Sequence, residues 1–369
     1  MNYGKKRRAS GNRYILFMRA KIRKEMEAEV TAKNTPRVSV IMPVWNCDSF
    51  VGEAVQSIVV QDFPDWELIV VDDASTDQTA KKVISINDPR IRLIQNETNR
   101  GVGNSLNTAL ATSRGEYVAR MDGDDISAPD RLSQQVLFME AHPEVGICGG
   151  WMQTFGHRDA VWRYPTDCEQ LRCALLFRSE LAHPTVMIRR SAFPEWPNLY
   201  RPLEVAEDYD FWARASNYTQ MCALPKILVN YRLHESNISK VRQDKIRSAN
   251  QDIHLLLLHN LAIAATNSEL DLHWAIARGD LPTDRQSLSN AEAWLLRLAE
   301  ANREAQVYKQ QPFEYLLFEL WFHLSRKFRG RRISKAENFL RSPLARTQAL
   351  PKRILATAQV LTSSDSNSG

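Results

Sequence analysis

The chain of 369 residues has few cysteines and no arrangement of them that is typical of a zinc site. There is no C-x-x-C pair and no zinc-type spacing with histidine. An odd, scattered set of cysteines is typical of reduced thiols in the core of a cytosolic protein, so we expect all five to be reduced. They are Cys47, Cys148, Cys168, Cys173 and Cys222.

Long apolar runs are also missing. No segment approaches the roughly 18 uninterrupted apolar residues that a membrane-spanning helix needs. The short apolar run at 14–18 is too short for a secretory signal core and has no small-residue cleavage site. We therefore expect a cytoplasmic protein that is soluble or is associated with the cytosolic face of a membrane.

Two glycine-rich phosphate-binding motifs are absent. The dinucleotide fingerprint G-x-G-x-x-G would follow the first predicted strand, where the chain has Pro43-Val44-Trp45-Asn46-Cys47. The phosphate-loop pattern G-x-x-x-x-G-K-[ST] does not occur, and Arg100-Gly101-Val102-Gly103 is too short for the dinucleotide fingerprint. Any bound phosphate is therefore expected to be held by a metal ion and side chains.

The charge is unevenly distributed along the chain. The net charge is +8 in residues 1–37, +9 in 324–353 and −1 in 354–369, which leaves −11 in 38–323. An acidic body is a poor nucleic-acid binder, so we expect no such partner. Residues 14–30 have the pattern of a basic amphipathic helix. Such a helix suits an anionic membrane surface, but it also suits packing on the protein itself or on a partner, and both interpretations stay open.

From residue 38, strands and helices alternate, which predicts an α/β fold with a mainly parallel central sheet. The predicted strands are 38–42, 66–71, 91–94, 116–119 and 145–148, and the predicted helices are 50–60, 76–84, 104–112 and 131–141. Helices are also predicted at 291–301 and 313–327. We divide the chain into a basic arm and linker (1–36), an α/β domain (37–240, with halves meeting near 150), a helical C-terminal region (241–362) and a disordered tail (363–369).

Three carboxylates, Asp122, Asp124 and Asp125, directly follow the fourth predicted strand. Ligands bind at the carboxyl ends of strands in open α/β sheets. Like charges this close raise each other's pKa unless a cation neutralises them, and Mg²⁺ or Mn²⁺ carried in on phosphates would do so. The alternative is an acidic turn that starts the helix at 131.

Five other polar residues are candidates. Asp73 follows the second strand, where an acid can bind a base or ribose, or cap a helix. Asp208 and Glu207 begin a predicted helix, where they complement its dipole or present a general base. His183, at the mouth of a strand, and His234, at the end of another, are either ligands or ordinary half-buried histidines.

Taken in order, these segments resemble the family 2 glycosyltransferases. The matching segments are 38–46, 71–77, 99–101, 115–125, 183–187, 207–212 and 231–234. The resemblance implies a GT-A fold and inverting transfer of one sugar from a nucleotide-diphosphate sugar, UDP-linked by default, to a hydroxyl of a glycan or lipid-linked acceptor. Cell-surface polysaccharide biosynthesis is the implied context. The Q-x-x-R-W motif of processive members is absent, since Phe211-Trp212-Ala213-Arg214 follows Asp208.

The resemblance also implies residue roles. It assigns the nucleotide sugar to Pro43, Trp45, Asn46, Asp73, Arg100, Arg120 and Asp122. It makes Asp124 the direct ligand of Mn²⁺ or Mg²⁺, supported by Asp122 and His234. Asp208 is the implied catalytic base, and His183 and Glu207 belong to the acceptor side. Asp125 is left for the turn and the start of the next helix.

Two alternatives are weighed against this interpretation. A nucleotidyltransferase would need a glycine-rich loop with a basic residue after the first strand, which the chain lacks. A catalytically degenerate scaffold or membrane-binding module would be favoured if Asp124 or Asp208 were missing, and both are present.

Overall fold

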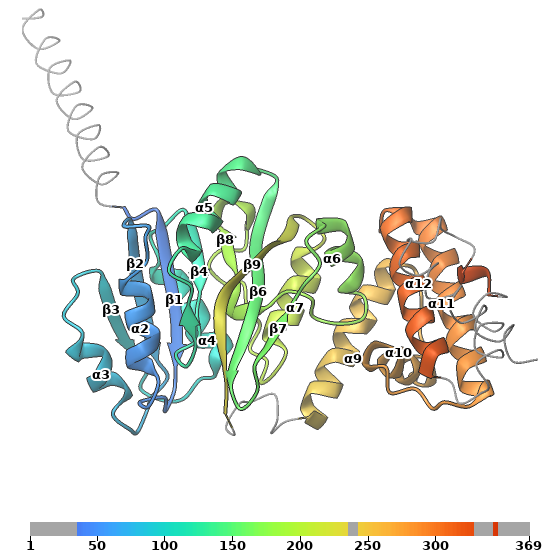
Figure 1. The fold of residues 1–369 in the computed structure, drawn as a ribbon, viewed down its shortest axis with the longest axis horizontal. Helices are drawn as coiled ribbons and strands as arrows, with labels where there is room; N and C mark the ends of the chain where they lie inside the picture. The colour runs from blue at the N-terminus through green and yellow to red at the C-terminus, as the bar shows by residue number, and fades with distance from the viewer. Residues whose placement is uncertain (1–34, 235–242, 328–341, 346–369) are drawn as a thin grey trace, which may run out of the picture.

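The computed structural model describes residues 35–234, 243–327 and 342–345 (Figure 1). The amphipathic helix predicted within 14–30 and the predicted tail at 363–369 lie outside the described residues. No helix in the described part of the chain is both long enough and apolar enough to cross a membrane.

The predicted alternation of strands and helices is confirmed, and the described strands form one sheet in the order β3-β2-β1-β4-β8-β6-β9-β5, with β7 added to β6. The strands are β1 (Val38–Val44), β2 (Trp66–Asp72), β3 (Ile91–Gln95), β4 (Tyr117–Arg120), β5 (Ile126–Ser127), β6 (Val145–Gly156), β7 (Ala160–Trp162), β8 (Met187–Arg189) and β9 (Gln220–Leu233). The α-helices are α2 (Val51–Val59), α3 (Thr79–Ser85), α4 (Val102–Thr112), α5 (Arg131–Ala141), α6 (Cys168–Ala174), α7 (Glu207–Ala215), α9 (Gln243–Asn260), α10 (Asn267–Arg278), α11 (Arg285–Ala305) and α12 (Gln310–Lys327).

Strands β1 to β4 are parallel neighbours, so their carboxyl ends share one edge. Val44 at the end of β1 pairs with Asp72 at the end of β2, and Ile41 pairs with Arg120 at the end of β4. Residues that follow these strands therefore meet at the same edge of the sheet, where ligands bind in open α/β folds.

Helices cover both faces of the sheet. Alternate side chains of a strand point to opposite faces, and on β1 the buried Val40 and Met42 pack with α2 and α5. Ile41 packs with the cluster on the other face, to which α4, α6 and α7 contribute. The C-terminal helices extend this second cluster and lie beyond α6 and α7 at one end of the molecule (Figure 1).

Two buried histidines attach the C-terminal helices to the turn that follows α6. The Nε2 atoms of His254 on α9 and His273 on α10 lie 3.0 Å and 2.8 Å from the carbonyl oxygens of Phe177 and Leu176. Trp294 on α11 donates its indole N–H to His273 Nδ1 at 3.1 Å. Burial lowers the pKa of both histidines, to about 4 for His254 and about 3 for His273, so both are neutral near pH 7.

One local prediction is corrected by long-range strand pairing. The strand predicted at 145–148 continues to Gly156, because β6 pairs in parallel with the long β9 from Val145 onward. The predicted place of His183 at the mouth of a strand is confirmed, since residues His183–Thr185 form a 3-10 turn and β8 begins at Met187.

The prediction of five reduced cysteines is wrong. Cys168 at the start of α6 and Cys222 on β9 form a disulfide, with their Cα atoms 4.6 Å apart. The bond joins residues 54 positions apart that are brought together by the packing of α6 against the sheet. Cys47, Cys148 and Cys173 are free thiols.

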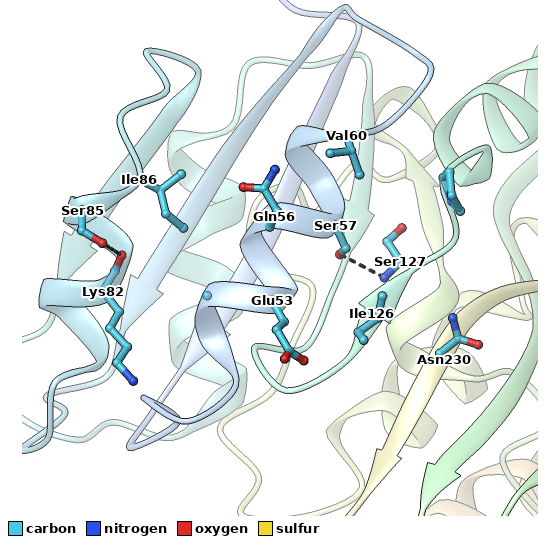
Figure 2. A pocket seen from close by; sticks show the side chains of 12 residues that line it. Glu53, Gln56, Ser57, Val60, Lys82, Ser85, Ile86, Ile126, Ser127 and Asn230 are labelled. Atoms are coloured by element: carbon cyan, nitrogen blue, oxygen red, sulfur yellow. Dashed lines mark hydrogen bonds between the residues drawn. The ribbon is translucent and has the colours of Figure 1, made fainter.

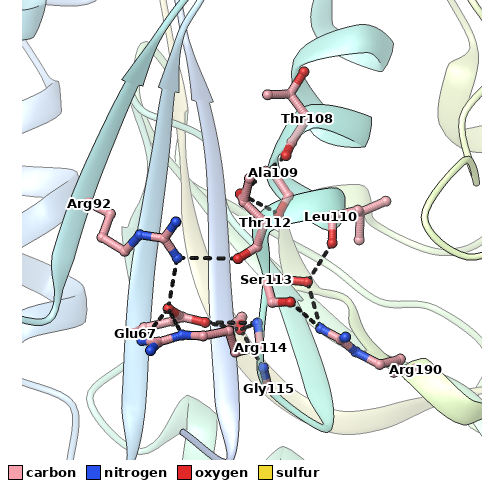
Figure 3. A network of polar contacts seen from close by, with 11 residues as sticks. Glu67, Arg92, Thr108, Ala109, Leu110, Thr112, Ser113, Arg114, Gly115 and Arg190 are labelled. Atoms are coloured by element: carbon pink, nitrogen blue, oxygen red, sulfur yellow. Dashed lines mark hydrogen bonds and ion pairs between the residues drawn. The ribbon is translucent and has the colours of Figure 1, made fainter. Parts of the chain in front are cut away.

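The amino ends of the strands are joined by a buried carboxylate (Figure 3). Glu67 on β2 accepts from Ser39 Oγ on β1 at 2.7 Å and from the backbone N–H of Arg114, which precedes β4, at 2.9 Å. The Arg114 guanidinium donates to its other oxygen at 3.0 and 2.8 Å, and Arg92 on β3 does so at 3.3 Å. Burial alone would raise the pKa of Glu67, but the bonds from Arg114 and Ser39 outweigh it and lower the pKa.

We expect Glu67→Gln to lower the free energy of unfolding at neutral pH by about 2–4 kcal/mol, because the buried charge-assisted bonds are lost. Since the folded pKa of Glu67 lies below its ordinary value of 4.5, this stabilisation is present above that pH and is lost as the pH falls. Urea unfolding at a series of pH values measures both effects. Glu116→Gln removes an exposed ion pair with Arg37 and should cost under about 1 kcal/mol. Equal losses in the two variants would contradict this role of Glu67.

Candidate functional site

The acidic loop, residues 121–125, follows β4 at the carboxyl edge of the sheet. The backbone N–H of Met121 donates to Ile41 O at 3.0 Å, which continues the β1–β4 pairing into the loop. A Cβ at Gly123 would lie 2.6 Å from Val44 Cγ1, so only glycine fits against the end of β1. As a result, one carboxylate oxygen from each of Asp122, Asp124 and Asp125 lies within 4.8 Å of the others.

The loop carboxylates repel one another in a partly buried place. Burial and the Asp124 charge raise the pKa of Asp122, although its ion pair with the buried Arg120 opposes the rise. Burial followed by the charges of Asp122 and Asp124 raises the pKa of Asp125 well above its ordinary value. Asp125 Oδ2 is buried, and no described residue donates to it. A divalent cation would reduce the repulsion between these carboxylates and would give Asp125 Oδ2 a partner.

We expected Asp125 to belong to the turn and the start of the next helix, but it does not start that helix. Its Oδ1 accepts from the backbone N–H of Arg232 on β9 at 2.9 Å, and α5 begins only at Arg131. Asp125 therefore ties the acidic loop to β9. Arg232 also donates from Nε to Asp124 O at 2.8 Å.

His234, next after β9, reaches the same loop. Its Nε2 lies 2.9 Å from Asp124 Oδ2, although the two residues are 110 positions apart. Its ring stacks on Phe50, the residue before α2, with centroids 5.1 Å apart. Because Asp124 and His234 are only partly buried, both can present atoms to a ligand.

The ends of β1 and β2 form a second part of this edge. Asp73 accepts from the backbone N–H groups of Arg100 and Gly101 at 2.9 and 2.8 Å, and from Asn96 Nδ2 at 2.7 Å. Gly101 has φ +83°, a conformation that favours glycine. Asp73 thus holds the loop that starts α4, and the predicted contact of Asp73 with a nucleotide base stays a prediction.

Trp45 and Asn46 form the turn beside Asp73. Asn46 adopts φ +48°, and its Oδ1 accepts from the backbone N–H of Thr76 at 2.8 Å. Trp45 is 57% exposed although it is large and apolar. Pro43 on β1 is half-buried, and the Arg100 side chain is exposed. The predicted nucleotide-site residues of β1, β2 and the Arg100 loop therefore lie together along one edge.

The helix predicted at 207–212 is confirmed as α7, which carries Glu207 and Asp208 in its first turn. Asp208 Oδ2 accepts from Ser179 Oγ at 3.4 Å, and its Oδ1 from the N–H of Tyr209 at 2.7 Å. Burial raises the pKa of Asp208, while these bonds and Arg120 lower it. Burial and the neighbouring Asp208 charge raise the pKa of Glu207 to about 7.

His183 lies against the first turn of α7. Its Nδ1 is 3.7 Å from Glu207 Oε1, and its Nε2 is 2.9 Å from the hydroxyl oxygen of Tyr200. Burial, and then the Arg120 charge, lower the pKa of His183 well below 6.5, so the ring is neutral. The structure therefore places His183 beside Glu207. This is compatible with the prediction that both residues belong to the acceptor side.

Sequence reasoning missed three residues of this site: Arg131, Arg232 and Tyr200. Arg131 is fully buried and donates from Nη2 to Arg120 O at 2.7 Å and to Val186 O at 3.2 Å. Burial, and then Arg120, lower its pKa to about 9. A basic residue at a helix start or a strand end has no local sequence pattern that predicts its tertiary contacts. The contacts of Arg131 and Arg232 could therefore not be predicted from the sequence.

An open pocket of the described structure lies away from these residues. It has a volume of about 820 Å³ and follows the outer side of α2, between α3 and the β5 segment (Figure 2). Its lining is mostly apolar and includes Val60 and Ile86. None of the predicted site residues lines it, so this pocket is not the predicted site.

Comparison with known proteins agrees with the site. The family model described as glycosyl transferase family 2 matches residues 39–198. An uncharacterized glycosyltransferase of Haemophilus influenzae is 31% identical over 223 residues, which cover 57% of this chain and 69% of the relative. The chain belongs to glycosyltransferase family 2. It is a glycosyltransferase of α/β fold.

Two further similarities extend this finding. Escherichia coli WfgD, named as a UDP-Glc:alpha-D-GlcNAc-diphosphoundecaprenol beta-1,3-glucosyltransferase, is 29% identical over 204 residues, covering 55% of this chain and 79% of WfgD. The crystal structure of Staphylococcus aureus TarS 1–349 in complex with UDP-GlcNAc matches with a TM-score of 0.50 and 22% identity, covering 76% of this chain and 91% of TarS 1–349. At this identity the likeness to TarS is one of fold, which is the predicted GT-A fold.

We expect Glu207→Gln to stabilise the metal-free protein at alkaline pH. The folded pKa of Glu207, about 7, exceeds its ordinary value of 4.5, so the wild type loses stability as the pH rises through this window. Asp208, Asp122, Arg120 and His183 surround the group and are unchanged in the variant.

Chemical unfolding in the presence of a chelator measures the difference. The two proteins should be nearly equal near pH 4, and the variant should be more stable by about 1–3 kcal/mol near pH 8. A pH-independent difference would contradict the raised pKa.

Proposed function

We propose that this glycosyltransferase transfers one sugar from a nucleotide-diphosphate sugar to an acceptor hydroxyl, with metal dependence and inversion at the anomeric carbon. The observation that carries the proposal is the position of Arg120. This buried cation pairs with Asp122 of the acidic loop and acts electrostatically on Glu207 and Asp208 of α7. The two acidic groups therefore lie near one buried cation, an arrangement that suits the two substrates of a transfer.

The donor nucleotide is assigned to the ends of β1 and β2. Trp45 offers an exposed aromatic face for a base, and Pro43 and Asn46 flank it. Asp73 orders the loop whose exposed Arg100 can meet the phosphates. WfgD uses a UDP sugar by its name, which supports a UDP-linked donor here.

The acidic loop fits a divalent cation. Asp124, Asp122 and His234 would hold Mn²⁺ or Mg²⁺, and the orphaned buried oxygen of Asp125 adds a further acceptor. Carboxylates and imidazole suit Mn²⁺, and carboxylates suit Mg²⁺. When bound, such an ion neutralises charge that grows on a departing diphosphate. Arg120 favours the ionised form of Asp122, against the effect of burial on its pKa.

Asp208 is the proposed general base. An acceptor hydroxyl is a weak nucleophile, and a positioned carboxylate that takes its proton accelerates attack by about 10²–10⁴-fold. Ser179 and the Tyr209 N–H fix one oxygen each. Attack from the α7 side, with the diphosphate on the acidic-loop side, would invert the anomeric centre. Glu207 and neutral His183 would line the acceptor side.

The proposed context is the biosynthesis of a cell-surface polysaccharide at the cytosolic face of a membrane, with a glycan or lipid-linked acceptor. The name of WfgD, which specifies an undecaprenol-diphosphate acceptor, supports an acceptor of this class. The basic ends of the chain are compatible with an anionic surface.

We expect Asp124→Ala and Asp208→Asn to abolish most donor turnover for different reasons. The assay measures hydrolysis and transfer of a panel of UDP-, dTDP- and GDP-linked sugars in the presence of Mn²⁺ or Mg²⁺. Asp124→Ala should lose metal-dependent UDP affinity, whereas Asp208→Asn should keep UDP affinity and lose about 10²–10⁴-fold in kcat.

Asp130→Asn is the matched control, because this exposed residue precedes α5 without a side-chain capping bond. Wild-type turnover in both Asp124→Ala and Asp208→Asn would overturn the mechanism. No turnover of any donor by the wild type would favour a degenerate scaffold.

His234→Ala should raise the Mn²⁺ concentration needed for half-maximal activity by about tenfold or more, because His234 contacts the Asp124 carboxylate. Saturating Mn²⁺ should restore most of the rate. The control is His259→Ala, an exposed histidine on α9. An unchanged Mn²⁺ requirement in His234→Ala would remove this histidine from the metal site.

A further inference from the structure

An exposed aromatic surface lies beside the acidic loop, and none of the roles above uses it. Trp162 on β7 is 43% exposed. Its ring centroid lies 5.7 Å from that of Tyr231 on β9, with 32° between the ring planes. Both β7 and β9 pair with β6, so the two rings meet across that strand. We name this pair of side chains the aromatic platform.

Tyr231 fixes one end of the platform at the acidic loop. Its neighbour Asn230 pairs with Ile126, the first residue after the loop. Its other neighbour, Arg232, donates its backbone N–H to Asp125. Burial and then the three loop carboxylates raise the pKa of Tyr231, so its hydroxyl stays a hydrogen-bond donor at neutral pH.

The other end of the platform is fixed on β6. Trp162 pairs with Met152 of β6. Tyr164 follows Trp162 by two residues, and its carbonyl accepts from Trp151 Nε1 at 3.1 Å, which holds this segment against β6. The platform is therefore held by β6 at one end and by the acidic loop at the other.

We propose that the aromatic platform binds a pyranose ring of the acceptor glycan beside the acidic loop; this inference rests on the proposed function. An exposed indole offers a flat apolar face, on which the C–H face of a pyranose packs while the sugar hydroxyls stay in water. The donor base cannot be the occupant, because Trp45 and Asp73 lie at the ends of β1 and β2. In the sheet, β4 and β8 separate these strands from β6 and β9.

The test is saturation-transfer-difference NMR on the full chain with UDP and Mn²⁺, using the methyl pyranosides of glucose, N-acetylglucosamine, galactose and mannose at millimolar concentration. At least one sugar should bind the wild type. Trp162→Ala should weaken that binding about tenfold, and Trp162→Phe should retain most of it. Tyr218→Ala is the control, because this exposed aromatic residue packs on Phe193 instead.

UDP affinity, measured by calorimetry, shows whether each variant is folded. If Trp162→Ala loses UDP binding, sugar binding is compared with Trp162→Leu instead, since leucine keeps apolar bulk without an aromatic face. Equal sugar binding by the wild type and the non-aromatic variant would overturn the proposal, and so would binding of none of the four sugars. Donor hydrolysis by the same wild-type preparation tests the proposed function separately, because it does not need the platform.

Discussion

The placement of three carboxylates at the end of one buried strand is the constraint on which this structure depends. Unopposed, their repulsion and burial would favour the neutral acids. Two buried cations, Arg120 and Arg131, lie behind them, and the backbone N–H of Arg232 approaches from β9. Each compensating group comes from a different element. These partners of the acidic loop are in place only when β4, α5 and β9 are assembled, which makes the site a product of the whole fold.

The part of this arrangement that could be predicted is the part governed by parallel strands. Regular alternation at 38–120 identifies strands and helices, and the carboxyl ends of parallel neighbours must share an edge. The convergence of Asp73 with Asp122 and Asp124 follows from that rule.

The contacts that could not be predicted join segments without a common local pattern. Asp125 looked like helix-start chemistry, but it binds the backbone of Arg232, 107 positions later. The length of β6 depends on β9, and the bond between Cys168 and Cys222 depends on the packing of α6 against the sheet. Each of these needs knowledge of which distant segments pair, and hydrophobic periodicity carries no such information.

Arg120 also links the acidic loop electrostatically to the two carboxylates of α7. It pairs with Asp122 and also lowers the pKa of Asp208 and Glu207, against the effect of burial. A diphosphate arriving at the acidic loop would bring negative charge that raises these pKa values, whereas a divalent cation arriving with it would lower them. The ionisation of the proposed base is thus coupled to donor binding through shared electrostatics. If the base is ionised only beside a complete donor and metal set, it would take the acceptor's proton, and the hydroxyl would attack, only when the leaving group is stabilised.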